Sequence, residues 1–536
     1  MRDVHPTKRT NHRPRGASTR GVARRSEAKQ AERGSAVGWI FAGALVLLAL
    51  CATSLVAQDA PRPDSETLTL DQAIRLAVEN NPNFQQTRND QAAADWSVRE
   101  AYSAFLPTAN ANFSAGFTEG GTQRIGTLDF GTQGTDWYSS NYSVNVNWTL
   151  DGNTVFGVPA ARASQRAVDA GIDAARFDLE SQVALRYMAV LRMQDGVEVA
   201  QRQLDRAQQN LRIVRSRVGS GAAAGTEGRQ AEVDQGRAEV GLIQAERQFR
   251  EARSLLAEQL GVALDDATVL SSEFTIFEPT WTRDELMDQA QSAHPSLQAF
   301  EAREKAASAS AKQAASQYFP SFSINTGLRG NTLQALSEDF VLNNESDFWN
   351  GRQSNCEFNN ALIQGVSTID GDLQDCSQFA FTDARRQAAL ETNAAFPFDF
   401  TRLPLSVSFQ VSIPVFTGFS RQRQVSQAYA QADDARHQLR AEELRLRTAV
   451  TQAYDNLTAA YRVVQLEEGN LALSEEQLQM QQRRYTLGAA SLLELLDAQT
   501  TLSTAEQAYL NALYDFHWNL IRLEAAVGQG LRPDGS

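Results

Sequence analysis

The chain has 536 residues, of which 42% are hydrophobic, and it carries a formal net charge of −14. This length is enough for a large core, while the composition is too polar on average for a protein built of membrane-spanning helices. Residues 1–57 contain 10 Lys or Arg and 3 acidic residues, which leaves 40 basic and 61 acidic residues and a net charge of −21 for the remainder. That charge disfavours a nucleic-acid partner, because phosphate binding needs a positive surface.

The N-terminus has the layout of an export signal. A basic segment over 1–35 precedes the apolar run "AVGWIFAGALVLLALCATSLVA" over 36–57, which ends in mostly small residues apart from Leu55. We therefore predict a signal peptide over 1–57. The run is also long enough to span a bilayer, so an uncleaved anchor is the alternative.

The rest of the chain is an internal repeat. The stretch "NNPNFQQTRNDQAAADWSVREAYSAFLPT", which begins at Asn80, returns as "AHPSLQAFEAREKAASASAKQAASQYFPS" from Ala293. Further along the chain the offset between the copies is larger, because the second copy contains an insertion. We predict two repeats, over 66–265 and 279–528.

Four stretches alternate apolar with polar residues, which is the period of a β-sheet with one apolar face. They cover 109–117, 142–150, 322–328 and 405–415. A soluble β-sandwich has the same alternation. The very long helical stretches on either side of the strands favour a membrane sheet instead.

Two long runs free of proline follow the second and fourth strand stretches, starting after Pro159 and Pro414. Each carries apolar residues at every seventh position, a pattern typical of a coiled-coil seam. In the first run these are Val183, Val190, Val197, Leu204, Leu211 and Val218, and at the equivalent positions of the second run Val450, Leu457, Val464, Leu471, Leu478 and Tyr485. A helix from Pro159 to Val218 would be about 90 Å long.

Each run is interrupted by a glycine-containing segment, "RVGSGAAAGTEGRQAE" over 217–232 and "RYTLGAASLLELLDAQ" over 484–499. These segments lie between a helix and its return, and we predict that they form the turns at the tips of two helical hairpins. The first segment lacks the Lys-Ser/Thr ending of a nucleotide-binding loop and follows a helix, so a phosphate site is disfavoured.

Four strands cannot close a barrel, and an open sheet edge in hydrocarbon leaves backbone groups unpaired. Three copies supply 12 strands, and a symmetric ring satisfies every edge. The expected fold is α+β, with long antiparallel coiled-coil hairpins and four transmembrane strands per chain that form a trimeric 12-stranded β-barrel.

The chain resembles the TolC-like outer-membrane efflux family from Leu68 to Gly528. The resemblance rests on "LTLDQAIRLAVENNP", "AFLPT" and "YFPS" before strands, "SIPVFTG" before a helix, and the second tip segment. It implies a homotrimer in the outer-membrane lipid, with an α-helical tunnel in the periplasm that meets an adaptor (membrane fusion protein) attached to an inner-membrane pump. The expected function is the exit duct of a tripartite efflux or type I secretion system. A non-conducting trimeric coiled-coil scaffold or adhesin is the alternative.

The resemblance also implies a periplasmic gate. Glu494 and Asp497 match the acidic positions around the narrowest point, where a trimer would gather six carboxylates. Tyr485 and Glu227 match residues that hold neighbouring helices shut. The family uses an arginine where this chain has Ala490, so we expect the closure to depend more on a hydrogen bond from Tyr485 to Glu227.

Small side chains at the tips suggest where an adaptor docks. Gly221, Thr226, Gly488 and Ser491 would allow another helical hairpin to approach closely. The alternative is that small residues merely permit the turns.

The second repeat contains its insertion between Gly327 and Leu403, which we place in an outward loop. It holds Cys356 and Cys376, which we expect to form a disulfide in an exported protein. The three histidines after residue 57, His294, His437 and His517, belong to no catalytic or metal motif. We therefore expect no enzyme activity, cofactor or metal, and assign His294 as a capping or surface residue.

Overall fold

The structure is a computed structural model, and the residues that it describes lie within the unit Arg62–Ser536. It describes residues 67–125, 128–131, 135–265, 268–271, 274–365 and 371–532, without the side chains of 122–131. The predicted signal peptide lies outside these described residues. None of the described helices combines the length and the apolar character needed to cross a bilayer.

The main sheet is antiparallel throughout. Its order is β2-β5-β7, and β8 and β9 both pair with β7. The strands are β2 (Thr108–Thr118), β5 (Trp137–Leu150), β7 (Ser321–Ala335), β8 (Thr401–Arg402) and β9 (Ser406–Ser412). The four predicted stretches fall on β2, β5, β7 and β9. The fourth ends earlier than expected, because Pro414 has no N–H group for a strand ladder.

The register of the sheet aligns apolar side chains across neighbouring strands. Trp148 of β5 lies opposite Ile324 of β7, which in turn lies opposite Phe409 of β9. Residues directly opposite each other share one face, so these three form a row across the sheet. Ile324 and Phe409 are exposed in the single chain.

Two small sheets accompany the main one. β3 (Thr122–Ile125) and β4 (Leu128–Gly131) form an antiparallel hairpin between β2 and β5. β1 (Thr67–Leu68) pairs in parallel with β6 (Val269–Leu270), and so joins the start of the first repeat to its end.

Two long helical hairpins extend from the sheet. The first consists of α4 (Gly152–Gly219) and α5 (Gly225–Leu260), the second of α10 (Ser420–Thr486) and α11 (Leu492–Val527). Helix α4 differs from the prediction, because it begins at Gly152 and continues through Pro159. Asp151 fixes this earlier start by accepting a hydrogen bond from Thr154 N at 2.7 Å.

Four shorter helices form two equivalent pairs, one in each repeat. They are α2 (Leu70–Asn80) and α3 (Pro82–Ser103) in the first, and α6 (Arg283–Ala293) and α7 (Pro295–Ala315) in the second. Thr69 and Thr282 form equivalent capping boxes at the starts of α2 and α6. His294 caps α7, since its Nδ1 accepts from Ser296 N at 3.1 Å, and it is buried rather than on the surface.

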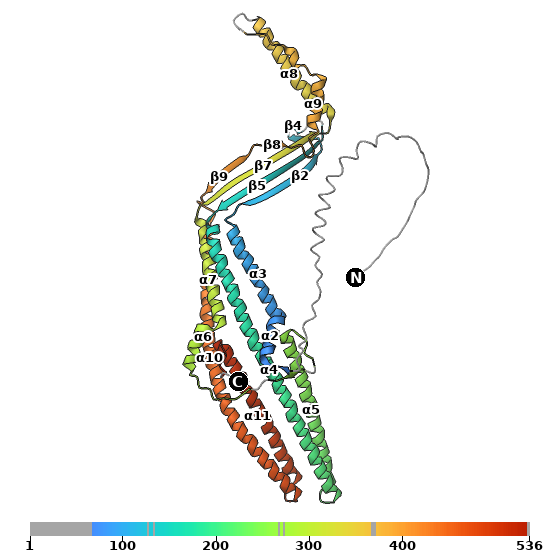
Figure 1. Cartoon of the computed structure of the whole chain (residues 1–536), viewed down its shortest axis with the longest axis vertical. Coiled ribbons are helices and arrows are strands. Elements are labelled where there is room, and N and C mark those ends of the chain that lie inside the picture. The colour runs from blue at the N-terminus through green and yellow to red at the C-terminus, as the bar shows by residue number, and fades with distance from the viewer. Residues whose placement is uncertain are drawn as a thin grey trace, which may run out of the picture. The chain divides into compact units, whose positions relative to one another are not determined.

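The helices lie in space in the same order as the strands to which they are connected. Helices α3 and α7 lead into β2 and β7, while β5 and β9 lead into α4 and α10. Farther from the sheet, the hairpin helices lie in the row α10, α11, α4, α5, with both tips at the same end (Figure 1). The outermost helices of this row are therefore α10 and α5.

The predicted seven-residue seam packs inside the hairpins. Most of its residues are buried, and Val197, Val218 and Leu471 are half-buried. The apolar interior forms three clusters. One lies between α2, α4 and α5, one between α6, α10 and α11, and one near the tips between both hairpins.

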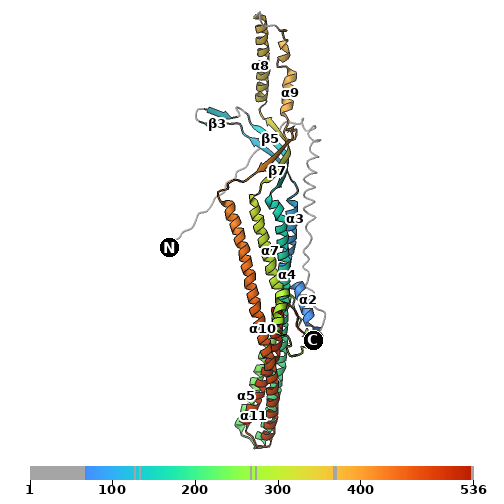
Figure 2. The ribbon, with the colours of Figure 1, turned by 90° about the vertical axis from the view of Figure 1, so that its left-hand side faces the viewer.

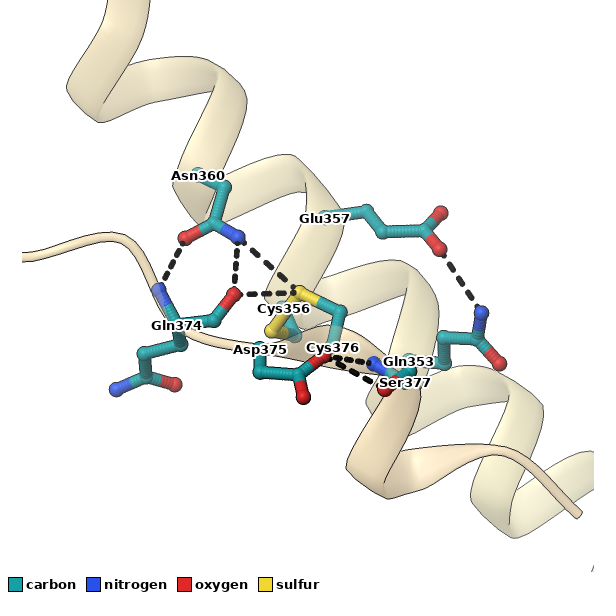
Figure 3. The surroundings of a disulfide bond; sticks show 8 residues. All are labelled: Gln353, Cys356, Glu357, Asn360, Gln374, Asp375, Cys376 and Ser377. Carbon is teal, nitrogen blue, oxygen red and sulfur yellow. Dashed lines mark hydrogen bonds between the residues drawn. A yellow bond between two sulfur atoms is a disulfide. The ribbon is translucent and has the colours of Figure 1, made fainter.

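The insertion is mostly helical. It contains α8 (Glu338–Gly365) and α9 (Asp383–Asn393), with the short 3-10 helix η2 (Cys376–Phe379) between them. It extends from the end of the sheet opposite to the hairpins (Figures 1 and 2). A disulfide joins Cys356 of α8 to Cys376 of η2 (Figure 3). Asn360 Nδ2 donates to Gln374 O at 2.7 Å and Asn360 Oδ1 accepts from Gln374 N at 3.0 Å, which holds the same two segments together.

Candidate functional site: the tips of the helical hairpins

Both tip turns depend on a glycine in the left-handed region. Gly221 has φ 77° and Gly488 has φ 74°, a conformation that costs other residues energy. Neither has a heavy atom within 4 Å of the position of an added Cβ. The turns therefore need glycine for backbone conformation, while the space around them is open.

A buried tyrosine joins the two hairpins beside the turns. Tyr485 Oη donates to Glu227 Oε2 at 3.0 Å, which links the end of α10 to the start of α5. Tyr485 is only 1% exposed. Burial, together with the hydrogen bond to Glu227, raises the pKa of the Tyr485 hydroxyl above its usual range. The tyrosine thus remains a neutral hydrogen-bond donor at ordinary pH.

Arg217 completes this contact, and no pattern in the sequence indicated it. Its guanidinium lies 4.2 Å from the centroid of the Tyr485 ring and donates to Tyr485 O. The chain has Ala490 where the resemblance implied an arginine, and a cation reaches Tyr485 from α4. A separation of 268 residues between Arg217 and Tyr485 left no local sequence signal.

Glu494 helps to cap helix α11 in addition to carrying a negative charge. Ser491 is the N-cap of α11, and Glu494 Oε2 accepts from Ser491 N at 2.7 Å while Glu494 N donates to Ser491 Oγ at 3.3 Å. The hydrogen bonds from the Ser491 backbone and hydroxyl lower the pKa of the Glu494 carboxyl. Asp497, one turn further along, is exposed, as is Glu494. The two carboxylates are spaced to share one side of the helix.

The four residues predicted to meet an adaptor lie at the two turns and are all exposed. They are Gly221, Thr226, Gly488 and Ser491. Ser491 is also the helix cap described above, so its role in the fold is separate from any role in docking.

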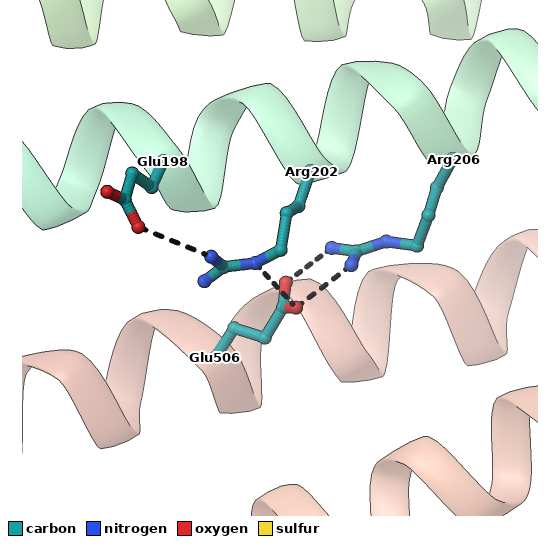
Figure 4. A network of polar contacts seen from close by, with 4 residues as sticks. All are labelled: Glu198, Arg202, Arg206 and Glu506. Atoms are coloured by element: carbon teal, nitrogen blue, oxygen red, sulfur yellow. Dashed lines mark hydrogen bonds and ion pairs between the residues drawn. The ribbon is translucent and has the colours of Figure 1, made fainter.

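A polar network ties the two hairpins together above the tips. Glu506 of α11 is buried and forms a two-pronged ion pair with Arg206 of α4 (Figure 4). Arg202 lies 3.9 Å from the same carboxylate and 3.9 Å from Glu198. The sequence did not predict these contacts, because the seven-residue pattern pairs helices within a hairpin and says nothing of how α4 meets α11.

Farther from the tips, a cavity of about 480 Å³ lies between α4 and α11, lined in part by Asp195, Tyr514 and His517. Tyr514 Oη donates to Asp195 Oδ2 at 2.6 Å. Burial of His517 and, to a smaller extent, the positive charge of Arg532 lower the pKa of its imidazole to about 4. In the described part of the chain, no group of three or more His, Cys, Asp or Glu residues is placed to hold a metal ion.

A five-stranded antiparallel sheet joined to two long helical hairpins is a fold shared with solved outer-membrane channels. A model of the outer membrane efflux protein family matches residues 73–262 and 382–529, and the chain belongs to this family. It is an outer-membrane channel protein whose helical tunnel lies in the periplasm. Its insertion, at the opposite end of the sheet, therefore lies on the outer side of the membrane.

Solved structures of similar fold agree. The outer membrane protein VceC from Vibrio cholerae shares 16% identity over 86% of this chain and 96% of its own, with a TM-score of 0.62. The MtrE outer membrane channel of Neisseria gonorrhoeae shares 19% identity over 90% of this chain and 95% of its own, with a TM-score of 0.62.

Sequence similarity to a curated relative is more limited. Outer membrane protein TolC of Escherichia coli (strain K12) is 25% identical over 122 residues, which are 23% of this chain. The match spans only a quarter of the length of that relative.

Proposed function

We propose that three copies of this chain form the exit duct of a tripartite efflux or type I secretion system. The duct receives substrates from an inner-membrane pump through a periplasmic adaptor. The observation that carries this proposal is the open sheet. Among the described strands, β2 pairs only with β5 and β9 pairs only with β7, so both edges are free. Pairing of β2 with β9 of the next copy closes a 12-stranded barrel without an exposed edge.

Four further assignments belong to this proposal. Residues 1–57 are the signal peptide removed on export, and the repeats over 66–265 and 279–528 are the two halves of each subunit. Glu494 and Asp497 surround the periplasmic aperture. The hydrogen bond between Tyr485 and Glu227 keeps this aperture narrow. The exposed turn residues receive the adaptor.

Conductance in planar bilayers tests the channel itself. The purified mature protein should run as a trimer in mild detergent and give stable, long-lived channels. A stable monomer with intact strands contradicts the shared barrel. Trimers that never conduct would instead favour the scaffold or adhesin.

Docking of the adaptor needs a separate variant. Thr226→Tyr adds bulk on the exposed first tip without changing a turn glycine or the Ser491 cap. It should reduce transport at least tenfold while trimers remain in the membrane. Ser426→Tyr, on an exposed site near the start of α10, is the matched control and should transport normally. Equal transport by both variants contradicts docking at the tip.

A further inference from the structure

A short irregular segment lies over one face of the main sheet, near the end that carries the insertion. We call this segment, residues 394–400, the strap, and it links α9 to β8. Asn393 fixes its start to the end of β7, because Asn393 Oδ1 accepts from Ala335 N at 2.9 Å and Asn393 Nδ2 donates to Ala335 O at 2.8 Å. Phe396 N donates to Gln334 Oε1 at 3.2 Å. Hydrogen bonds to β7 therefore hold the strap in place.

The strap packs on the apolar face of the sheet. Phe396 is stacked on Tyr138 with ring centroids 5.0 Å apart, and Phe400 lies edge-on to Tyr142 at 4.8 Å. These two tyrosines share their face of β5 with apolar residues such as Val144, since successive side chains of a strand point to opposite faces. In a membrane barrel the apolar face meets lipid and the polar face lines the lumen. The strap is thus on the lipid side of the proposed barrel.

The strap lies at the outer edge of the membrane. Phe322, near the start of β7, and Gly330, opposite Tyr142, are eight residues apart. They are separated by about 27 Å along the strand, or about 20 Å along the membrane normal for a strand tilted by about 40°. The apolar band of such a barrel is about 25 Å tall. Gly330 is therefore near the level at which the lipid headgroups of the outer leaflet begin.

One cross-strand row at this level ends in an arginine. Arg402 of β8 lies opposite Gly330 of β7. Gly330 in turn lies opposite Tyr142 of β5, which lies opposite Phe113 of β2. Residues directly opposite each other share one face, so all four are on the lipid side. The Tyr142 ring covers Gly330, since a Cβ added to this glycine would meet the ring at 2.4 Å. A cation and aromatic rings thus share one row.

The side chain of Arg402 is exposed and has no partner within the chain. Among the described residues, no ion pair or hydrogen bond engages its guanidinium, although Asp399 is only three residues away. An arginine at the edge of a membrane extends its charge to the level of the headgroups. The anions at that level are phosphates, and the planar guanidinium can bind two phosphate oxygens at once. An anion from outside the chain therefore suits this position.

Apolar surface remains open in the same row. Phe398 of the strap is stacked on Phe113 with ring centroids 6.1 Å apart, and the two residues are 65% and 56% exposed. By contrast, Ser140 and Thr332 of the same face are buried, and Ser140 Oγ donates to Pro397 O at 2.6 Å. The strap thus covers hydroxyl groups that lipid cannot satisfy and presents phenyl rings that acyl chains can contact.

We propose that this corner of the sheet binds a lipid of the outer leaflet that has a phosphorylated headgroup. Arg402 holds the phosphate, and Phe398 and Phe113 contact the acyl chains. Three strand spacings, about 15 Å, separate Arg402 from Phe113. One lipid can span this distance, since a leaflet of hydrocarbon is also about 15 Å thick. A lipid fits better than a soluble anion because the cation belongs to the membrane-facing surface and has exposed phenyl rings in its row. The inference rests on the proposed function only in assigning the apolar face to lipid.

Binding of phosphatidic acid to the purified trimer tests the charged half of the site. In native mass spectrometry the trimer should bind phosphatidic acid at least fivefold more tightly than diacylglycerol, which lacks the phosphate. Arg402→Gln should abolish this preference, whereas Arg402→Lys should keep part of it, because lysine binds phosphate as a point charge. The matched control is Arg329→Gln, since Arg329 is exposed on the polar face one residue before Gly330. It should keep the full preference, and equal loss in both glutamine variants overturns the site.

The apolar half needs its own variant. Phe398→Ser should weaken the binding of phosphatidic acid at least threefold, while Phe358→Ser, at a 61% exposed position of α8, should not. Inorganic phosphate that binds as tightly as phosphatidic acid would make this a site for free anions and refute the lipid. Trimers that conduct without any preference for phosphatidic acid also refute the lipid site, and leave the proposed function intact. Absence of trimers refutes the proposed function, and with it the assignment of the apolar face to lipid.

Discussion

Tyr485 is the residue on which the tip contact depends. Its hydroxyl bonds to Glu227 and its ring lies under Arg217, so α10, α5 and α4 meet at one side chain. Removal of a hydrogen bond to a charged group costs about 1.5–3 kcal/mol, which is enough to shift a closed tip toward open states.

Tyr485→Phe with Glu227→Gln should therefore raise the resting conductance of purified channels several-fold in planar bilayers. Tyr429→Phe is the control, since Tyr429 lies on the same helix, is exposed, and is far from the tip. Conductance equal to the parent in both variants would show that closure depends on other residues.

The charge that Glu494 and Asp497 bring to the proposed aperture can be separated from helix capping by substitution. Glu494→Ala would remove both, whereas Glu494→Gln keeps a side chain that suits a capping box. Glu494→Gln with Asp497→Asn should therefore reduce cation selectivity and divalent block of the channel, while the helical circular dichroism remains that of the parent. Unchanged selectivity and block would place the selective charges elsewhere.

The same capping bonds set the pH range of this effect. Because they lower the pKa of Glu494 from its usual 4.5, its carboxylate stays ionised as the pH falls through that value. The stabilisation that the ionised Glu494 gives to the helix cap is complete above the ordinary pKa of 4.5. It is lost only as the pH falls through the lowered pKa of the folded chain. Cation preference measured against pH should then decline below 4.5. A decline centred on about 6 would indicate another group.

His517 makes the fold sensitive to mild acid. Burial holds its pKa at about 4, so it is neutral in the folded chain, while the unfolded chain binds a proton below about 6.5. The free energy of unfolding should fall by up to about 3 kcal/mol between these pH values. His517→Phe, in a site beside Phe274 and Phe516, should narrow the difference in melting temperature between pH 7 and pH 5. The exposed His437→Phe should leave that difference as it is.

At the scale of elements, a buried ion pair joins the two hairpins. Glu506 is buried between α11 and α4, so loss of its carboxylate leaves Arg206 without its main partner. Removing one partner of a buried pair is costly, and Glu506→Ala should destabilise the fold by about 2–4 kcal/mol.

Thermal loss of helical circular dichroism is the measurement. Glu180→Ala removes the carboxylate of the exposed pair with Arg176 on α4 and should change stability by less than about 0.5 kcal/mol. Similar losses in both variants would mean that the contact between α4 and α11 contributes little to stability.

The sequence predicted the hairpins, their inner seams and the strand positions, because each follows from a local period. Two features of the elements did not follow from such a period. Pro159 suggested a boundary that α4 ignores, since the Asp151 cap starts the helix two turns earlier, at Gly152. The insertion was expected as a loop and has two helices, because its apolar residues show no clean repeat.

At the scale of the whole molecule, the described strands leave both edges of the main sheet unpaired, so the sheet of one chain does not close into a barrel. The resemblance pointed to Tyr485, Glu227, Glu494 and Asp497, and the structure brings the first two into contact. Arg217 and the Glu506 network escaped prediction, since each joins positions in different repeats, far apart along the chain, without any local pattern. Long-range pairing of this kind is visible only once the hairpins are side by side.

The insertion should be dispensable for assembly. Replacing 338–393 by a short Gly-Ser linker removes α8 and α9 but leaves the pairing of β7 with β5 and β9 intact. Trimer yield and single-channel conductance should stay within about twofold of the parent. Cys356→Ser with Cys376→Ser keeps the insertion without its disulfide and serves as the control. Loss of trimers on deletion alone would mean that the insertion contributes to the contact between copies.

The position of the insertion also determines which parts of the channel sequence can change independently during evolution. It begins after the last paired residue of β7 and ends before β8, at the end of the sheet farthest from the tips. Changes in its length or surface alter neither the strand register nor the heptads of the hairpins. Selection by the environment outside the cell and selection by the export machinery inside it can therefore act on separate stretches of one gene.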